Sequence, residues 1–359
     1  MAATWISTAS VPEYHCLIPR SHPCLSPARQ SNLQIQTKMP HCRSGKRRTP
    51  RNKREEIKKD LDVQLRNLRV LGRKHSANAL RIKLHHVSLG ELRASYKPRQ
   101  VDVDPVLLQE APNFTTYQSS QDTPLLLYGS DNGFIAARFR IKDSTLPSQV
   151  SAFINALPAT KPHHHKGVER SPDYKSIHCG FWCAYMPEPR LTAEHREHQK
   201  AVDEFLDLCQ PVFREMTAIL GGLAPRVFKE FQQYPLPNDA RRPCGAWSAC
   251  AINNGGNDPN ETNVHRDVKE SRYGYSAVFA SGDYTGGHII LYQLRCKIEM
   301  QPGDILLFPD SLIHHNNERA EGSRESIVLF TQDNMNDYWV RKYRIHKRGV
   351  SRHARKTTR

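Results

Sequence analysis

The chain has 359 residues, 38% of them hydrophobic and 25% charged, so it can bury one large core or two smaller ones. We find no run of about eighteen apolar residues and no apolar leader, so we expect neither a membrane span nor a secretory signal. The nine cysteines are scattered and odd in number, which fits a reducing compartment better than a disulfide framework.

The net charge of +16 is distributed unevenly along the chain. Residues 1–100 carry 21 lysines and arginines against 6 acidic residues, and residues 341–359 carry 9 against none, which leaves 22 against 30 between them. Basic ends suit a polyanion because their charges neutralise phosphates. We therefore expect the N- and C-terminal segments to bind nucleic acid, with solvated charged runs as the alternative.

The N-terminal part is predicted to be a disordered basic segment, residues 1–54, because it is rich in Ser, Pro, His and Arg without hydrophobic periodicity. Its basic cluster at residues 46–54 is typical of a nuclear address or a nucleic-acid contact. We therefore predict a nuclear location, and otherwise a cytoplasmic one.

A basic helical segment and linker are predicted over residues 55–122. Apolar side chains recur there at helical spacing, at Ile57, Leu61, Leu65, Leu68 and Leu71. Such a basic amphipathic helix could lie on nucleic acid or pack on the rest of the chain. Prolines and polar residues over 100–122 indicate the linker.

The main domain is predicted over residues 123–340, followed by a basic tail at 341–359. Two strands joined by a hairpin turn are expected within residues 125–141. Residues 191–233 have helical periodicity, broken at Pro211, and should cover the outer face of a sheet. From about 245 to 335 the pattern changes to short β-rich runs separated by turns, which indicates a barrel or sandwich.

A candidate metal site lies within this β-rich region. His265 and Asp267 are two residues apart, so on a strand they face the same side. A second histidine, His314 or His315, follows the apolar strand DILLFP. Adjacent residues on a strand point to opposite faces, so only one of these two can reach the metal. Two histidines and one carboxylate with open positions are typical of non-haem Fe(II) oxygenases.

A carboxylate-binding pair follows shortly afterwards. Arg324 and Ser326 again share one face of a strand, and a guanidinium binds a carboxylate bidentately. The far carboxylate of 2-oxoglutarate would suit this position. Asn253 or Asn254, on the strand that enters the barrel, could also donate to the co-substrate, and a structural turn role is equally open.

The ordered set of motifs resembles the fungal branch of the TET/JBP-like oxygenases, a family of Fe(II)/2-oxoglutarate dioxygenases. The matching elements are His265-Arg266-Asp267, Gly282-Asp283-Tyr284-Thr285-Gly286-Gly287, Pro302-Gly303-Asp304-Ile305, His314-His315-Asn316, Arg324-Glu325-Ser326 and Phe330-Thr331-Gln332. The chain departs from the family pattern at Glu318-Arg319, where the family often has Pro-Ile, and it lacks the cysteine-rich zinc region of the animal enzymes.

The resemblance implies an α+β fold with a double-stranded β-helix core of the jelly-roll or cupin-like type, flanked by helices. It implies Fe(II), 2-oxoglutarate and dioxygen as cofactors. The alignment favours His314 over His315, so the implied catalytic metal ligands are His265, Asp267 and His314. Co-substrate binding would fall to Arg324, Ser326 and Asn253.

The expected activity is hydroxylation of a substrate C–H bond, with a 5-methylpyrimidine in nucleic acid as the first candidate substrate. A prolyl-type protein hydroxylase is the alternative, because it shares the barrel and the ligand set. A non-catalytic nucleic-acid-binding protein with a degenerate barrel is the second alternative.

Overall fold

The fold is seen in a computed structural model of the protein, in which residues 50–98, 102–158, 175–183, 188–237, 240–254 and 261–343 are described. Most of the predicted basic segment 1–54 and of the basic tail 341–359 lies outside these residues. The parts that are described belong to helices α1 (Pro50–His75) and α9 (Asp333–Tyr343). No helix in the described ranges is long and apolar enough to cross a membrane.

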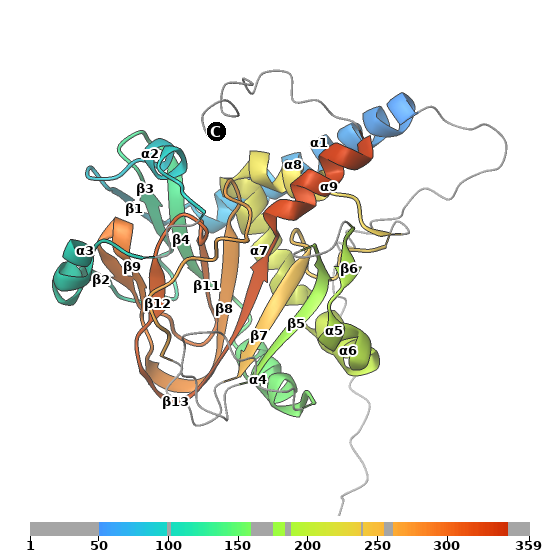
Figure 1. Ribbon diagram of the computed structural model, residues 1–359. Helices are drawn as coiled ribbons and strands as arrows, with labels where there is room; N and C mark the ends of the chain where they lie inside the picture. The colour runs from blue at the N-terminus through green and yellow to red at the C-terminus, as the bar shows by residue number, and fades with distance from the viewer. Residues whose placement is uncertain are drawn as a thin grey trace, which may run out of the picture. The chain divides into compact units, whose positions relative to one another are not determined.

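Nine strands of the described chain form one large, mainly antiparallel sheet (Figure 1). In spatial order they are β1 (Leu80–Lys83), β3 (Leu125–Tyr128), β4 (Phe134–Arg140), β11 (Asp304–Phe308), β8 (Ser276–Gly286), β13 (Ala320–Phe330), β7 (Ala249–Asn254), β5 (Lys175–Trp182) and β6 (Arg190–Leu191). The hairpin expected within residues 125–141 is confirmed as the antiparallel pair β3 and β4, with Asn132 in the left-handed conformation at its turn.

A second, small sheet faces part of the large one. Its strands, in order, are β12 (His315–Asn317), β9 (Ile289–Leu291), β10 (Cys296–Ile298) and β2 (Thr115–Tyr117). Apolar side chains from both sheets meet between them, among them Val278, Leu291, Leu306 and Phe308. Two sheets facing one another across a shared core confirm the predicted jelly-roll architecture.

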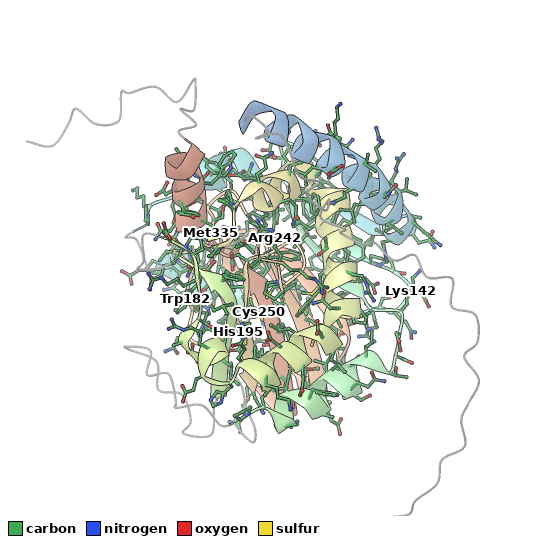
Figure 2. The ribbon with its side chains drawn as sticks, turned by 90° about the vertical axis from the view of Figure 1, so that its right-hand side faces the viewer. Lys142, Trp182, His195, Arg242, Cys250 and Met335 are labelled. Atoms are coloured by element: carbon green, nitrogen blue, oxygen red, sulfur yellow. The ribbon has the colours of Figure 1, made fainter. Side chains whose placement is uncertain are left out.

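The opposite face of the large sheet carries a layer of helices (Figures 1 and 2). These are α1, α4 (Leu146–Ala156), α5 (Ala193–Glu197), α6 (Gln199–Leu208), α7 (Gln210–Leu223) and α8 (Pro225–Gln233). The break predicted at Pro211 is confirmed, because α6 ends at Leu208 and the proline occupies the first turn of α7. Short elements complete the described fold: α2 (Leu89–Ala94), α3 (Pro105–Glu110), and the 3-10 turns η1 (Ala111–Asn113) and η3 (Tyr292–Leu294).

Helix α1 packs on the body through its apolar face. Leu61, Leu65 and Leu68 are buried, and Gly72 meets Gly222 of α7 so closely that a Cβ on Gly72 would lie 2.5 Å from the Gly222 Cα. Both helix backbones therefore need glycine at the crossing. Of the two roles left open for this amphipathic helix, the structure shows packing.

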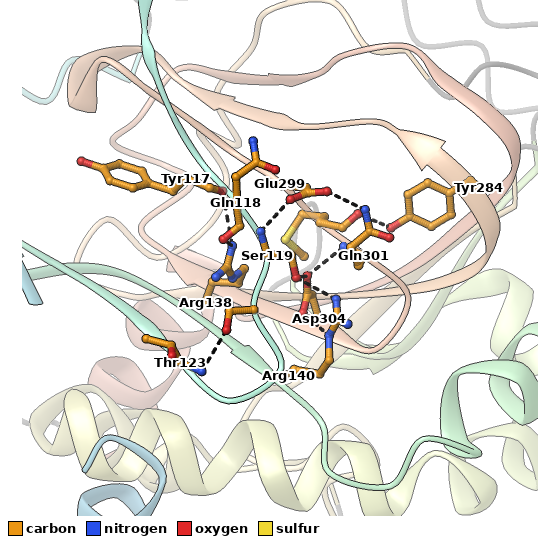
Figure 3. Close-up of polar contacts among 12 residues, drawn as sticks. Tyr117, Gln118, Ser119, Thr123, Arg138, Arg140, Tyr284, Glu299, Gln301 and Asp304 are labelled. Carbon is orange, nitrogen blue, oxygen red and sulfur yellow. Dashed lines mark hydrogen bonds and ion pairs between the residues drawn. The ribbon is translucent and has the colours of Figure 1, made fainter. Parts of the chain in front are cut away.

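The predicted helical segment and linker, residues 55–122, contribute strands to both sheets. β1 pairs in parallel with β3 of the large sheet, and β2 pairs in parallel with β10 of the small sheet. The chain after β2 is held by a buried polar network around Asp304 (Figure 3). The Asp304 carboxylate accepts from Arg140 Nε at 2.8 Å and from Ser119 Oγ at 2.6 Å. A buried carboxylate is tolerated because its charge is paired in this way.

Cysteine chemistry agrees with the expected absence of a disulfide framework in the part of the chain that is described. Its cysteines are all free thiols and buried: Cys179, Cys183, Cys209, Cys244, Cys250 and Cys296. Cys250 lies near His195 in the core beneath the helices (Figure 2). These thiols act as small apolar groups in the packing.

Candidate active site

The His-x-Asp segment and the histidine after β11 meet at one end of the space between the two sheets. His265 and His315 form an isolated antiparallel bridge, in which each backbone N–H donates to the other carbonyl at 3.0 and 2.9 Å. The backbone N–H of Asp267 donates to the carbonyl of Asp310 at 3.3 Å. Backbone pairing alone therefore places the three side chains together.

His265, Asp267 and His315 form a cluster whose potential ligand atoms all lie within 4.8 Å of one another. The two imidazole rings are 4.4 Å apart between centroids, and His315 Nε2 lies 3.6 Å from the Asp267 carboxylate. Such a set of two imidazoles and one carboxylate fits a divalent iron and leaves other coordination positions for small molecules.

Backbone carbonyls fix the orientation of both rings. His265 Nδ1 lies 2.7 Å from the Asn263 carbonyl oxygen, and His315 Nδ1 lies 2.9 Å from that of Ile313. A carbonyl oxygen only accepts, so in the neutral rings Nδ1 carries the proton and Nε2 is the nitrogen that can bind a metal. This is the usual arrangement for metal-binding histidines.

His315 is buried against the ring of Phe308, 5.0 Å away between centroids. Burial by itself lowers the pKa of His315, but the hydrogen bond and the negative charge of Asp267 outweigh it and leave the pKa above its ordinary value. The environment of His315 therefore favours a positive charge at this point of the cluster.

The structure brings His315, rather than the preferred His314, beside His265 and Asp267. The two residues are adjacent and point in different directions, and the pairing of His315 with Leu291 of β9 decides which one faces the cluster. His314 instead lies against Gln293, whose Nε2 is 2.7 Å from the His314 Nδ1 and whose Oε1 accepts from the His314 backbone N–H. The motif alignment favours His314 because it carries no information on the strand pairing that turns His315 toward the cluster.

The structure buries Arg324 within the core and gives it an aromatic neighbour. Arg324 is 2% exposed, and its guanidinium lies over the ring of Tyr284 at 5.6 Å. The Tyr284 hydroxyl donates to the Met300 carbonyl at 2.7 Å, which holds the ring in place. Gly287, with a φ of +65°, leaves room for this arginine, because a Cβ there would lie 3.1 Å from the Arg324 Cδ.

Ser326 lies two residues further along β13, on the same face as Arg324. It is buried, and Asn253 Nδ2 donates to its hydroxyl at 3.3 Å, while Ser176 donates to Asn253 Oδ1 at 3.0 Å. Asn254 points elsewhere and donates to Asn155 of α4 at 3.0 Å. Of the two asparagines left open by the sequence, the structure brings Asn253 to Ser326.

The metal cluster and the Arg324 pair share one core. Tyr284 beneath Arg324, Ala280 opposite Ser326 and Phe308 beside His315 all belong to the apolar cluster between the two sheets. The metal cluster and the Arg324–Ser326 pair therefore border the same apolar core.

Two acidic residues that sequence reasoning missed lie beside the cluster. Burial and the charge of Asp267 raise the pKa of Asp310 to about 7. Burial and the charges of Asp310 and Asp267 also raise the pKa of Glu270 well above its usual range. Crowded carboxylates raise one another's pKa, and a bound cation relieves that repulsion. Their positions after Asp267 and after the strand DILLFP gave no recognisable spacing signal.

Comparison with known proteins identifies the domain. Residues 180–333 match the family model Tet_JBP, the oxygenase domain of the 2OGFeDO superfamily. A search of curated proteins gave no match.

Among solved structures, NgTET1 in complex with 5mC DNA has 14% sequence identity over 77% of this chain and 91% of that chain, with a TM-score of 0.50. An oxidoreductase of the 2OG-Fe(II) oxygenase family from Burkholderia pseudomallei has 14% identity over 70% and 93% of the two chains, with a TM-score of 0.33. The first likeness supports the fold, and the second is too weak to carry an argument.

The donor set and the family agree. Two imidazoles with Nε2 available to a metal, one carboxylate and a buried guanidinium facing the same core are the groups that Fe(II) and 2-oxoglutarate require. The cofactors predicted from the sequence, Fe(II), 2-oxoglutarate and O₂, are confirmed by the family. Residues 180–333 therefore match the oxygenase domain of the 2OGFeDO superfamily, and this match supports an Fe(II)/2-oxoglutarate-dependent dioxygenase.

Proposed function

We propose that His265, Asp267 and His315 hold the iron, and that Arg324 and Ser326 bind the far carboxylate of 2-oxoglutarate. The observation that carries this assignment is the convergence of the first three side chains within 4.8 Å. The buried Arg324 guanidinium supplies a bidentate, permanently charged partner for a carboxylate. Asn253 supports it by orienting the Ser326 hydroxyl.

Each residue has a defined task in this assignment. When bound, Fe(II), 2-oxoglutarate and O₂ supply the oxidising power that hydroxylates a substrate C–H bond and release succinate and CO₂. The Asn263 and Ile313 carbonyls keep the two imidazoles in the tautomer that a metal needs. The Tyr284 ring supports the guanidinium from below, and the apolar side chains between the sheets exclude water.

We infer that the substrate is a 5-methylpyrimidine in nucleic acid. The family match and the likeness to NgTET1, which was solved with 5mC DNA, support this substrate class. The strongly basic ends of the chain support a polyanionic partner. A methyl group inside a duplex lies beyond the reach of a buried metal, so the base must be flipped out or single-stranded.

The test incubates the full-length protein with a 5-methylcytosine duplex, Fe(II), 2-oxoglutarate and ascorbate, and measures oxidised bases by mass spectrometry. We expect 5-hydroxymethylcytosine with matching succinate release, and neither from Asp267→Ala. Proline-containing peptides are incubated in parallel. Hydroxylated peptide without any oxidised base would refute the proposed substrate and favour a protein hydroxylase.

We also propose a nuclear location on the strength of the basic cluster at residues 46–54. A fluorescent fusion should concentrate in nuclei, and glutamine substitution of Lys46, Arg47 and Arg48 should disperse it. An unchanged distribution after those substitutions would contradict the assignment.

A further inference from the structure

An arginine–tyrosine cluster lies beside the candidate metal site. We define it as Arg93 and Tyr96, from α2 and the turn after it, with Arg266, Arg272 and Tyr273 from the segment that also carries His265 and Asp267. Arg272 and Tyr273 are exposed, and the other three are half-buried. Neither the metal nor the co-substrate role assigned above uses these side chains.

Tyr273 lies between two guanidinium groups. The Arg272 Cζ is 4.7 Å from the centre of the Tyr273 ring, and the Arg93 Cζ is 5.6 Å from it. Arg93 Nη2 also donates to the Tyr273 carbonyl at 3.5 Å. Cation–π contacts of this kind hold long, charged side chains at the surface in a fixed position.

The second half of the cluster ties α2 to the His-x-Asp segment. Arg266 lies over the Tyr96 ring at 5.6 Å and donates to the Lys97 carbonyl at 2.9 Å. The Tyr96 hydroxyl donates to the Val268 carbonyl at 3.0 Å. The cluster is therefore fixed to the same short segment that positions His265 and Asp267.

Several cationic side chains gather on this surface. The exposed Lys97 and Lys269 lie on the same two segments and add to the three arginines. The nearby acids are Glu91 on α2, Asp333, which affects Tyr96, and the carboxylates at the metal cluster. Five cations on a surface that also exposes an aromatic ring are typical of a groove or ridge that contacts nucleic-acid phosphates.

We propose that the arginine–tyrosine cluster binds the phosphate backbone of the nucleic-acid strand whose base enters the active site. This inference rests on the proposed nucleic-acid substrate. Guanidinium groups bind phosphate bidentately, and guanidiniums held on tyrosine rings lose little side-chain freedom on binding. Arg266 stands between His265 and Asp267 in the sequence and lies over the Tyr96 ring, so the cluster adjoins the metal site.

The test compares wild type, Arg93→Gln/Arg272→Gln and a control, Arg196→Gln. Arg196 is exposed on α5, on the other side of the fold from α2 in Figure 1. Binding of a fluorescein-labelled 5-methylcytosine duplex is measured by anisotropy from 50 to 200 mM salt. Each lost phosphate contact lowers the slope of log K against log salt by roughly 0.9, so the double variant should lose about 2 and the control none.

Oxidation kinetics separate phosphate binding from a structural role. We expect the double variant to raise KM for the duplex by about tenfold, with a much smaller change in kcat, and the control to match wild type. A double variant with a lower melting temperature but the wild-type salt slope would show that the cluster only holds the fold, which overturns the proposal.

The outcomes also separate this inference from the proposed substrate. If wild type oxidises the duplex and the double variant keeps both the slope and KM, the binding surface is refuted and the substrate stands. If the double variant loses two phosphate contacts relative to wild type, but wild type oxidises no base, the binding surface stands and the proposed substrate is refuted. If wild type does not bind the duplex, both fail.

Discussion

The adjacent histidines of β12 and its preceding turn offer the sharpest test of the site. Replacing His315 by alanine removes one of the three candidate ligands, whereas replacing His314 removes a side chain held by Gln293. The two variants change the same atoms at neighbouring positions, so each is the control for the other. Only the register of β12 against β9 distinguishes them.

His315→Ala is expected to lose iron affinity, whereas His314→Ala is expected to lose folding stability. Residues that merely support a ligand change metal affinity by about 10–100-fold, so loss of a ligand itself should cost His315→Ala at least about 100-fold, or about 2.7 kcal/mol. In His314→Ala the Gln293 amide loses a partner, which costs about 1–3 kcal/mol of folding stability. Iron affinity in that variant should change by less than tenfold.

Anaerobic Fe(II) titration by calorimetry measures the affinity, and succinate release reports turnover. Thermal unfolding of both variants shows whether a loss comes from misfolding. Loss of iron in His314→Ala, with iron retained in His315→Ala, would refute the assignment of the third ligand and the register argument behind it.

Two further changes test other parts of the structure. Gly287→Ala places a Cβ 3.1 Å from the Arg324 Cδ at a φ of +65°. The KM for 2-oxoglutarate should therefore rise about tenfold or more, while the affinity for iron is kept. An unchanged KM would remove Arg324 from the co-substrate site. Burial raises the pKa of Glu215 from 4.5 to about 7, so the folded state holds its proton more tightly and stability falls as pH rises between those values. The free energy of unfolding of Glu215→Gln, measured with denaturant, should therefore match wild type near pH 4.5 and exceed it by up to about 3 kcal/mol at pH 8. An equal difference between the two proteins at both pH values would contradict this reasoning.

Strand periodicity predicted much of the site because each strand presents alternate residues to one core. It placed Arg324 and Ser326 on one face of β13. The same rule does not account for His265 and Asp267, because His265 lies in an isolated bridge and Asp267 lies outside any strand. It could not choose between His314 and His315, because that choice depends on pairing with Leu291, more than twenty residues away in the chain. The local sequence around His314 and His315 does not determine such a register.

Parallel pairing explains what was missed in the N-terminal part. Leu80 of β1 pairs with Leu125 of β3, and Thr115 of β2 pairs with Cys296 of β10. Short strands without strong alternation resemble helix or linker sequence when their partners lie far along the chain. The carboxylates of Glu270 and Asp310 were missed for a related reason, because they meet Asp267 only through loops.

Strand β13 packs against the helical layer on one face and carries candidate site residues on the other. One side of this strand carries Arg324 and Ser326, and the other buries Ile327 and Leu329 against the helices. A trimmed fragment of residues 245–335 would expose those two side chains to water at a cost of about 1.5–3 kcal/mol each. Expression of a shortened enzyme therefore has to retain the helices, although the proposed iron and co-substrate site lies on the other face of the sheet.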